Sequence, residues 1–221
     1  MAHSTITIAG LKGGIAKTSL AVNLAAYWAE KGAKTLLIDA DVNGSALKLY
    51  ERGNKGLLPA GSLCVPLQQA PMAMAKAWDF VLMDTAGGSR DEQQTYAEGS
   101  DFVVCPCQPA ASSIEQVIDL AEVIQATGTG FGVLLTMVDK RRASDAVKAK
   151  SLFKKLGIPT LKTEISLLSA WPKAECSGLA VKDAKADSGK PDPGAKKAWL
   201  QIGAVAAEIA DQLGAAGSIA A

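Results

Sequence analysis

The sequence predicts a single α/β domain of three layers, in which helices cover both faces of a mostly parallel twisted sheet. Two observations carry this prediction. Short apolar runs of strand length alternate with helical patterns along the chain, as consecutive strand–helix–strand units require. The length of 221 residues fits one domain, and the sequence contains no internal repeat and no heptad run. We therefore expect residues 1–221 to fold as one unit.

The elements follow one another in regular alternation. The pattern predicts strands near residues 5–10, 34–39, 63–66, 79–84, 101–106, 131–137 and 158–163. It predicts helices near residues 17–31, 44–52, 69–77, 91–98, 112–126, 142–156, 170–177 and 194–213. Sheets of this kind bind ligands beyond the carboxyl ends of their strands, so residues that follow a predicted strand are candidates for a site.

The first predicted strand runs into a turn rich in glycine and then into a helix. Residues 12–19 read KGGIAKTS. Such a turn directs consecutive backbone N–H groups into one concavity at the positive end of a helix dipole, which is a phosphate site. Lys17 would reach the β- and γ-phosphates, and the Thr18 hydroxyl would bind Mg²⁺. The residues predicted to hold the nucleotide are Lys12, Gly13, Gly14, Ile15, Ala16, Lys17, Thr18 and Ser19.

This P-loop departs from the common pattern G-x-x-x-x-G-K-[ST], because Leu11 and Ala16 stand where that pattern has glycine. It matches the variant K-G-G-x-x-K-[ST], with Lys12 before the glycine pair, and so resembles the ParA/MinD family of deviant Walker A ATPases. The resemblance implies a P-loop NTPase fold and an ATP-sandwich homodimer in which Lys12 reaches the partner's ATP. If Ala16 needs a positive φ, alanine costs about 1 kcal/mol there, and we expect nucleotide binding to survive.

A second apolar run, residues 36–41, reads LLIDAD and ends in two carboxylates. Asp39 and Asp41 share a face in a strictly extended strand, although the end of a strand can relax this. Carboxylates beside phosphates must be neutralised by Mg²⁺ or lysine, or their pKa values rise. The family resemblance implies that Asp41 activates the attacking water and that Asp39 supports the metal shell. Val42 and Asn43 replace the Pro-Gln pair that the family has here.

A third strand, residues 80–84, ends in Asp84 and resembles a Walker B strand, whose carboxylate holds Mg²⁺ through water. The predicted metal residues are thus Thr18, Asp39 and Asp84. Residues 85–88 read TAGG and suit a switch loop that senses the γ-phosphate. Together with Asp84 they resemble the D-x-x-G switch of GTPases. Residues 136–139 partly match the guanine motif [NT]-K-x-D, with methionine in place of lysine, so GTP stays open beside ATP.

The charge is unevenly distributed along a chain whose net charge is +1. Residues 139–197 contain 14 Lys and Arg against 7 Asp and Glu, an excess of +7, which leaves −6 for the rest. ParA-like proteins bind DNA non-specifically through basic residues of the C-terminal half, and the alternative is a solvated helix face. The candidates for DNA binding lie on or near the predicted helix 142–156: Lys140, Arg141, Arg142, Lys148, Lys150, Lys154 and Lys155. Lys173, Lys196 and Lys197 could extend this patch.

Cysteine and histidine usage excludes several kinds of chemistry. The four cysteines lack zinc-type spacing, and we expect Cys105 and Cys107, at the end of an apolar run, to be reduced core thiols and not a disulfide. With His3 as its one histidine, the chain builds no Ser-His-Asp or Cys-His site. No apolar run has membrane-spanning length and no leader is recognised, so we expect a cytoplasmic protein.

Two segments fall outside the regular pattern. Residues 182–194 are rich in Lys, Asp, Ser, Gly and Pro and predict an exposed, flexible loop. Residues 214–221 predict a disordered tail. The tail has no Lys or Arg, which argues against the basic amphipathic membrane anchor of MinD-type proteins.

The resemblance covers roughly residues 5–213 and implies a complete functional cycle. The chain matches the short ParA type without an N-terminal helix-turn-helix, as in plasmid-partition proteins or carboxysome-positioning McdA-like proteins. ATP and Mg²⁺ would close a homodimer that binds non-specific DNA on the nucleoid. A ParB-like or other cargo-linked protein would then trigger slow ATP hydrolysis, and the subunits would leave the DNA. The alternatives are a MinD-like regulator at the membrane, a metabolic ligase or synthetase of the same superfamily, and an iron–sulfur protein.

Overall fold

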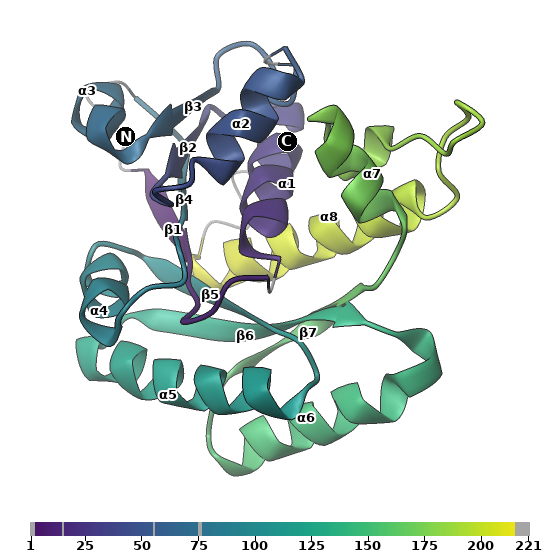
Figure 1. The fold of residues 1–221 in the computed structure, drawn as a ribbon. Helices are drawn as coiled ribbons and strands as arrows, with labels where there is room; N and C mark the ends of the chain where they lie inside the picture. The colour runs from purple at the N-terminus through teal and green to yellow at the C-terminus, as the bar shows by residue number, and fades with distance from the viewer. Residues whose placement is uncertain (1–2, 15, 55, 75–76, 215–221) are drawn as a thin grey trace.

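A computed structural model describes residues 3–14, 16–54, 56–74 and 77–214 of the chain. Seven strands form one sheet in the order β3-β2-β4-β1-β5-β6-β7 (Figure 1). Their bounds are β1 Ser4–Ile8, β2 Thr35–Asp39, β3 Leu63–Pro66, β4 Phe80–Asp84, β5 Phe102–Cys107, β6 Gly130–Val138 and β7 Thr160–Ser166. Each neighbouring pair in this sheet is parallel. The predicted three-layer α/β fold with a mostly parallel sheet is therefore confirmed.

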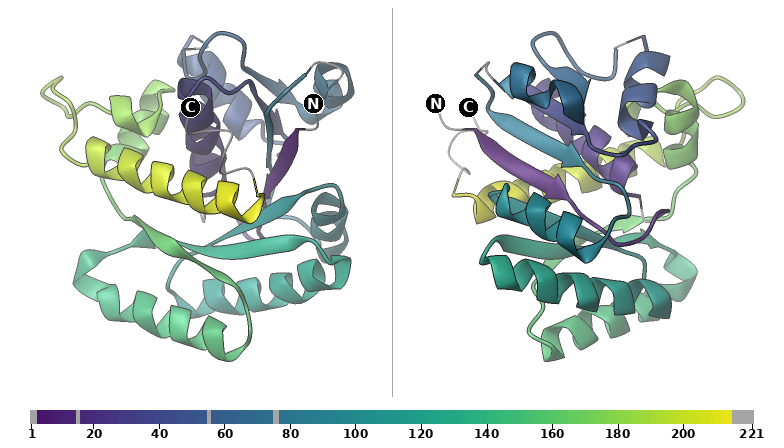
Figure 2. Two further views of the ribbon diagram at one scale, coloured as in Figure 1. Left: turned by 180° about the vertical axis from the view of Figure 1, so that it is seen from behind. Right: turned by 60° about the vertical axis from the view of Figure 1, so that its left-hand side comes forward.

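Helices cover the sheet on both faces (Figure 2). One side carries α1 Lys17–Glu30, α2 Ser45–Arg52 and α8 Ala195–Gln212, with α7 Ala170–Ser177 packed between α2 and α8. The other side carries α3 Ala70–Met74, α4 Arg90–Glu98, α5 Ala111–Thr127 and α6 Ala143–Lys155. Short 3₁₀ turns lie at Leu67–Gln69, Lys140–Arg142 and Val181–Asp183.

Side-chain alternation along the strands divides the core between the two faces. Ile6 and Ile8 of β1 point to the side of α1, where Trp28 stacks on Phe80 of β4 with ring centroids 4.4 Å apart. Thr7 points to the opposite side, where its hydroxyl lies 2.7 Å from that of Ser100. Both faces of the central strands are buried, as is expected when helices cover a parallel sheet on each side.

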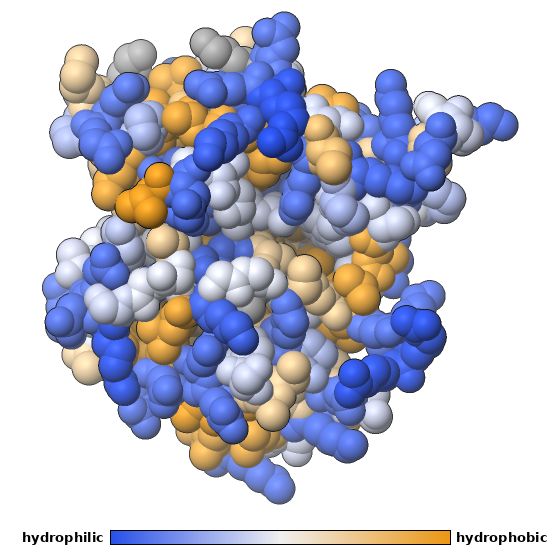
Figure 3. Space-filling model, in the orientation of Figure 1, coloured by the Kyte–Doolittle hydropathy of each residue, from blue (hydrophilic) through white to orange (hydrophobic). Residues whose placement is uncertain are grey.

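The surface is mostly polar. Figure 3 shows charged and polar side chains over most of one face, interrupted by small apolar patches. Val42 and Met72 are among the exposed apolar side chains. Among the described residues, no helix has the length and apolar character needed to cross a membrane.

The last strand differs from its predicted bounds. It was expected over residues 158–163, but β7 spans Thr160–Ser166. The N–H of Ile158 still donates to the carbonyl of Phe153 in α6, at 2.9 Å, so residues 156–159 complete the end of the helix. The prediction ended the strand too early because the residues after Leu161 are polar. Polar residues occur there because β7 lies at the edge of the sheet and has partly exposed side chains.

Two other predicted segments are described only in part. The predicted helix 69–77 appears as α3 up to Met74, and residues 75–76 lie outside the described residues. The tail prediction for 214–221 falls on residues 215–221, which also lie outside them.

The segment 182–194 is mostly exposed, but Ala184 is buried, and so is Asp192, which serves as an anchor. Lys185 and Pro191 form an antiparallel bridge across it, and Asp192 is 4% exposed. The Asp192 carboxylate accepts a hydrogen bond from the Gly194 N–H at 2.8 Å and pairs with Lys173 Nζ at 3.1 Å. These contacts hold the end of the segment against α7, while its flexibility stays a prediction.

All four cysteines are free thiols, and Cys105 and Cys107 lie on the same face of β5, in the core beside α5 and α6. Cys64, Cys105 and Cys107 are buried as expected. The expectation of a core position is wrong for Cys176, which is exposed because it lies on the outer side of the short helix α7.

Candidate functional site

The candidate site lies at the carboxyl edge of the sheet, where β1, β2 and β4 end side by side. Asp84 at the end of β4 is in register with Ile8 of β1 and with Asp39 of β2. Strand β1 has β4 on one side and β5 on the other, so the connections after these strands diverge at this point. Parallel α/β sheets bind ligands at such a divergence. The sheet therefore brings the three predicted motifs to one place.

The loop after β1 has the backbone of a phosphate cradle. Gly14 and Ala16 have φ values of 77° and 69°, and α1 begins at Lys17 directly afterwards. Ala16 is the N-cap of α1 but its side chain offers no capping oxygen, so N–H groups of the first turn stay available to an anion. The positive φ of Ala16 is thus real, and the predicted cost of alanine applies. Ile15, predicted to bind nucleotide, lies outside the described residues.

Two lysines of this loop occupy different environments. Lys17 is 7% exposed, and its Nζ donates to the carbonyl oxygen of Lys12 at 2.7 Å. Burial lowers the pKa of Lys17, while the nearby charges of Asp84 and Asp41 oppose that shift. The Lys12 side chain is exposed. The backbone of Lys12 therefore holds Lys17 in the loop, while its own ammonium group is free to reach outward.

Asp84 has the environment of a metal-binding carboxylate. It is fully buried, and neither of its oxygens has a hydrogen-bond partner among the described residues. Burial raises the pKa of Asp84 to about 7, and the neighbouring Thr18 hydroxyl and Lys17 charge limit the rise. A buried carboxylate without a partner is costly, and a divalent cation beside Thr18 would satisfy it.

The residues present fit Mg²⁺ held by a few protein oxygens better than they fit a metal enclosed by protein side chains. The described residues contain no cluster of three or more His, Cys, Asp or Glu side chains that could enclose a metal. Mg²⁺ commonly keeps several waters and binds one or two protein oxygens together with substrate phosphates. Thr18 and Asp84 are therefore the residues of this chain that would hold it.

Asp39 and Asp41 are oriented differently. Asp39 is buried, and its oxygens accept hydrogen bonds from the N–H of Leu47 at 2.8 Å and from the N–H of Asp41 at 3.1 Å. Burial raises the pKa of Asp39, and these backbone donors oppose the rise. Asp39 thus fixes the start of α2 against the end of β2. A role for Asp39 in the metal shell stays a prediction.

Asp41 lies beyond the end of β2, in a turn. Its Oδ1 accepts hydrogen bonds from the backbone N–H of Asn43 at 2.8 Å and from Asn43 Nδ2 at 2.9 Å. Asn43 therefore orients Asp41, a role that the sequence did not reveal. Val42 is 97% exposed between them. Asp41 faces the same cavity as Gly13 and Lys17, which places it within the candidate site.

The switch loop after β4 packs closely on the P-loop. A Cβ atom at Gly87 would lie 2.9 Å from the carbonyl carbon of Lys12 and 3.0 Å from the nitrogen of Gly13. Only glycine allows this approach. Thr85 anchors the base of the same loop, since its hydroxyl donates to the carbonyl oxygen of Ile8 at 2.8 Å. The switch loop and the P-loop are thus in direct backbone contact.

Three further side chains hold the site together and were not identified from the sequence. Gln108, after β5, places its Nε2 at 2.9 Å from both the carbonyl oxygen of Gly14 and Met137 Sδ. Gln93 on α4 accepts a hydrogen bond from the N–H of Gly10 at 3.2 Å. The carboxylate of Glu175 on α7 accepts a hydrogen bond from the Ser19 hydroxyl. The position of Gln108 at the carboxyl end of a strand was a usable signal, whereas Glu175 gave none.

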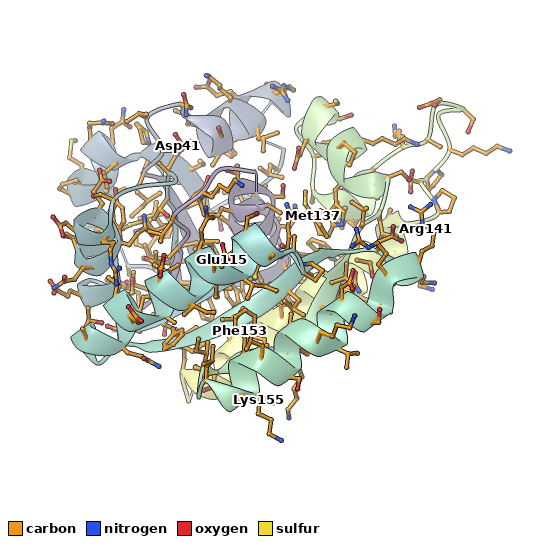
Figure 4. The ribbon with its side chains drawn as sticks, turned by 60° about the horizontal axis from the view of Figure 1, so that its bottom comes forward. Asp41, Glu115, Met137, Arg141, Phe153 and Lys155 are labelled. Atoms are coloured by element: carbon orange, nitrogen blue, oxygen red, sulfur yellow. The ribbon has the colours of Figure 1, made fainter. Side chains whose placement is uncertain are left out.

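Two adjoining cavities make up the site. The first, about 240 Å³, is mainly apolar and lies between α1, the end of β6 and the start of α7. Its walls include Leu20, Met137, Ile165 and Trp171. The second, about 470 Å³, lies over the P-loop and reaches Asp41. Figure 4 shows Met137 and Asp41 on different elements of the molecule. An apolar cavity next to a phosphate cradle suits the base and the phosphates of a nucleotide.

The aspartate of the partial guanine motif pairs with a neighbouring arginine. The Asp139 carboxylate accepts hydrogen bonds from Arg141. Arg141 Nε lies 3.1 Å from each of the two carboxylate oxygens, and Arg141 Nη2 lies 2.8 Å from Oδ2. Asp139 lines neither of the two cavities. The hydrogen bonds from Arg141 lower the pKa of Asp139. The structure therefore gives the GTP alternative no support at this strand end.

The seven predicted DNA-binding residues lie on α6 and on the short turn before it. Arg141 and Lys155 mark opposite ends of this stretch (Figure 4). Acidic neighbours pair with four of the seven: Arg141 with Asp139, Arg142 and Lys148 with Asp145, and Lys150 with Glu164. Lys140, Lys154 and Lys155 are exposed and have no ion pair among the described residues.

A parallel sheet whose central strand ends in a P-loop, beside a strand that ends in a buried aspartate, defines a P-loop nucleotide-binding domain. The chain belongs to the CobQ/CobB/MinD/ParA nucleotide binding domain family, which matches residues 6–181. The predicted family is thereby confirmed.

Known relatives fall within the same family. The chain is 32% identical over 173 residues to the maintenance of carboxysome distribution protein A of Gloeobacter kilaueensis, covering 77% of this chain and 80% of that protein. It is 30% identical over 174 residues to the chromosome-partitioning ATPase Soj of Thermus thermophilus, covering 62% and 70%. The septum site-determining protein MinD of Pyrococcus horikoshii, solved with Mg-ADP, has the same fold, with a TM-score of 0.69 at 17% identity over 94% and 96% of the chains.

Proposed function

We propose that this chain is a ParA-type ATPase that binds ATP with Mg²⁺, closes as a homodimer, binds DNA non-specifically and positions a cargo. The observation that carries the proposal is the P-loop itself, in which Lys17 is buried at the cradle and Lys12 is exposed at its rim. The names of the relatives, which include carboxysome distribution and chromosome partitioning, support a positioning role.

Each residue of the site has a distinct task in ATP hydrolysis. The N–H groups of the loop 13–18 bind phosphate oxygens, and Lys17 exchanges the carbonyl of Lys12 for a phosphate. Mg²⁺, when bound, neutralises phosphate charge, and Thr18 and Asp84 hold it. Asp41, oriented by Asn43, positions the attacking water and accepts its proton. Because Gly87 touches the P-loop backbone, the switch loop senses whether the γ-phosphate is present.

The exposed position of Lys12 supports the proposed dimerisation. Its ammonium group is outside its own cradle, so it contributes to catalysis by neutralising phosphate charge in the partner's site. Hydrolysis is slow in the single subunit because this contact is absent there. A ParB-like or other cargo-linked protein accelerates the reaction and resets the cycle. We propose that the protein works in the cytoplasm on the nucleoid, where the closed dimer presents basic residues of α6 to DNA phosphates.

Co-sedimentation with non-specific duplex DNA tests this function. The wild type, Lys12→Ala and a control, Lys34→Ala, are compared with no nucleotide, ADP, ATP or GTP at two salt concentrations. We expect the wild type and Lys34→Ala to bind DNA with ATP only, and to release it at higher salt. Lys12→Ala should bind ATP in calorimetry but fail to dimerise and to hold DNA.

Two outcomes would contradict the proposal. Normal ATP-dependent dimerisation of Lys12→Ala would remove the role assigned to that lysine. ATP binding without DNA binding in the wild type would demote the basic residues of α6 to a solvated face. ATP-dependent binding to anionic vesicles in that case would favour the MinD-like alternative.

A further inference from the structure

The two cavities of the site share a wall. Four residues line both of them: Ala16, Ser19, Met137 and Glu175. When the base of a nucleotide lies in the apolar cavity and its phosphates lie over the P-loop, the sugar that joins them lies against this shared wall. The side chains at the wall therefore face the ribose, whichever base is bound.

Ser19 and Glu175 supply the polar side chains of this shared wall. The Ser19 hydroxyl donates to Glu175 Oε1, which ties α1 to α7. The main-chain carbonyl of Glu175 accepts a hydrogen bond from Arg52 Nη1 of α2 at 2.6 Å. Three helices that surround the site thus converge on Glu175, and its backbone is fixed by a contact separate from that of its carboxylate.

The chemistry of the carboxylate selects its ligand. An ionised carboxylate only accepts hydrogen bonds and has about four lone-pair positions, of which Ser19 uses one. The triphosphate has acceptors only, so Glu175 repels it. The 2′- and 3′-hydroxyls of ribose are two adjacent donors, and a carboxylate can accept both. A carboxylate that holds ribose hydroxyls is the same solution that dinucleotide-binding folds use.

We infer that Glu175 recognises the 2′- and 3′-hydroxyls of the ribose and makes the site selective for nucleotides that carry them over 2′,3′-dideoxynucleotides. This inference rests on the nucleotide site of the proposed function and adds a specificity-determining residue to it. Ser19 is its positioning partner, since the Ser19 hydroxyl holds the carboxylate at the wall.

Calorimetric titration with Mg²⁺ and either ATP or 2′,3′-dideoxy-ATP tests the inference, because the two ligands differ only at the ribose. A hydrogen bond to a charged group discriminates by roughly 10- to 100-fold, so we expect the wild type to bind ATP more tightly by about that factor. Glu175→Ala should bring the affinity ratio close to one. Glu175→Gln keeps one acceptor and should give an intermediate ratio. Glu122→Ala, which removes an exposed glutamate of α5 outside both cavities, should keep the wild-type ratio.

The ratio, and not the affinity alone, decides the result. Removing a negative charge near the phosphates strengthens the binding of both ligands, and a general loss of structure weakens both, so neither effect changes the ratio. Equal affinities of the wild type for the two ligands would overturn the inference, as would a ratio that persists in Glu175→Ala. Both results leave ATP binding and the proposed function intact. A wild type that binds neither ligand would overturn the proposed function and this inference with it.

Discussion

At the scale of single residues, Ala16 and Gly87 show how closely the site depends on backbone geometry. Ala16 adopts φ 69°, a region that L-residues avoid, at the one position where the P-loop turns into α1. Gly87 lies where a Cβ atom would collide with the backbone of Lys12. Ala16 is therefore strained at a position where glycine would adopt the same φ without strain, whereas at Gly87 no residue with a Cβ atom fits.

Ala16→Gly should stabilise the nucleotide-free protein. Relief of the left-handed strain is worth about 1–2 kcal/mol, and the added freedom of glycine in the unfolded chain offsets about 0.4–1 kcal/mol. We therefore expect a net gain between zero and about 1.6 kcal/mol in the free energy of unfolding, measured in urea. Ala25→Gly, inside α1, is the matched control and should lose at least about 1 kcal/mol. A loss of stability in Ala16→Gly would show that the turn is not strained.

Gly87→Ala should weaken nucleotide binding more than it weakens the fold. Its new methyl group would push the switch loop and the P-loop apart, and such overpacking typically costs about 1–3 kcal/mol. We expect a fall of about 10-fold or more in ATP affinity by calorimetry, because the displaced backbone belongs to the phosphate cradle. Gly99→Ala is the control, since a Cβ atom there meets its nearest neighbour at 3.7 Å. Equal ATP affinity in both variants would refute the close contact.

At the scale of elements, the sequence predicted the seven strands and eight α-helices of the described residues, but not the three 3₁₀ turns or the exact bounds of β7. The fold followed from the alternation of strands and helices. Asp39, Asp41 and Asp84 could be assigned to the candidate site from the sequence because each lies at the end of an apolar run of strand length. The roles of Gln108, Gln93 and Glu175 could not be predicted, since their partners lie 94, 83 and 156 residues away in the chain. Contacts of that kind are set by how strands and helices pack, and no local pattern in the sequence records them.

The contact between the segment 182–194 and α7 makes a pH-dependent prediction. Hydrogen bonds from Gly194, Lys173 and Ser169 lower the pKa of Asp192, so its charged form is favoured in the folded state. The stabilisation is complete above the ordinary aspartate pKa of about 4 and is lost as the pH falls through the lowered folded-state pKa. Asp192→Asn should cost about 1–3 kcal/mol near pH 7 in urea unfolding, and less as the pH approaches 3.

The exposed Asp187 provides the control for this measurement. Its carboxylate lies 4.0 Å from the same Lys173, but its side chain is fully exposed. Asp187→Asn should change the free energy of unfolding by well under about 1 kcal/mol at each pH. If Asp192→Asn behaves like Asp187→Asn, the buried anchor contributes nothing to stability.

At the scale of the whole molecule, the charge pattern is less concentrated than the composition indicates. The helix α6 has 13 residues and is about 20 Å long, so its basic residues are spread from the site edge of the sheet toward the opposite edge. Acidic side chains close to the turn and to α6 neutralise part of the excess. Any affinity for DNA must therefore come mostly from the unpaired lysines.

Salt dependence separates these two groups of basic residues. Replacing both Lys154 and Lys155 by alanine should reduce the slope of log K against log salt by about 2, since each phosphate contact contributes about 0.9. The matched pair is Arg142→Ala with Lys148→Ala, whose partner Asp145 already neutralises part of their charge. The Arg142→Ala, Lys148→Ala double variant should reduce this slope by less than the Lys154→Ala, Lys155→Ala double variant does. The reverse order, measured by DNA binding with ATP across a salt series, would contradict the assignment.

The position of β1 in the middle of the sheet has a consequence for how the protein is made. Ile6 pairs with Leu82 of β4 and with Phe102 of β5, so β1 has no neighbour in the sheet until residues far along the chain have been synthesised. At about 5–20 residues per second, the ribosome needs roughly 4–16 s to reach β4. During that interval an apolar strand is exposed, and we expect nascent chains ending before β4 to depend on chaperones and to aggregate without them.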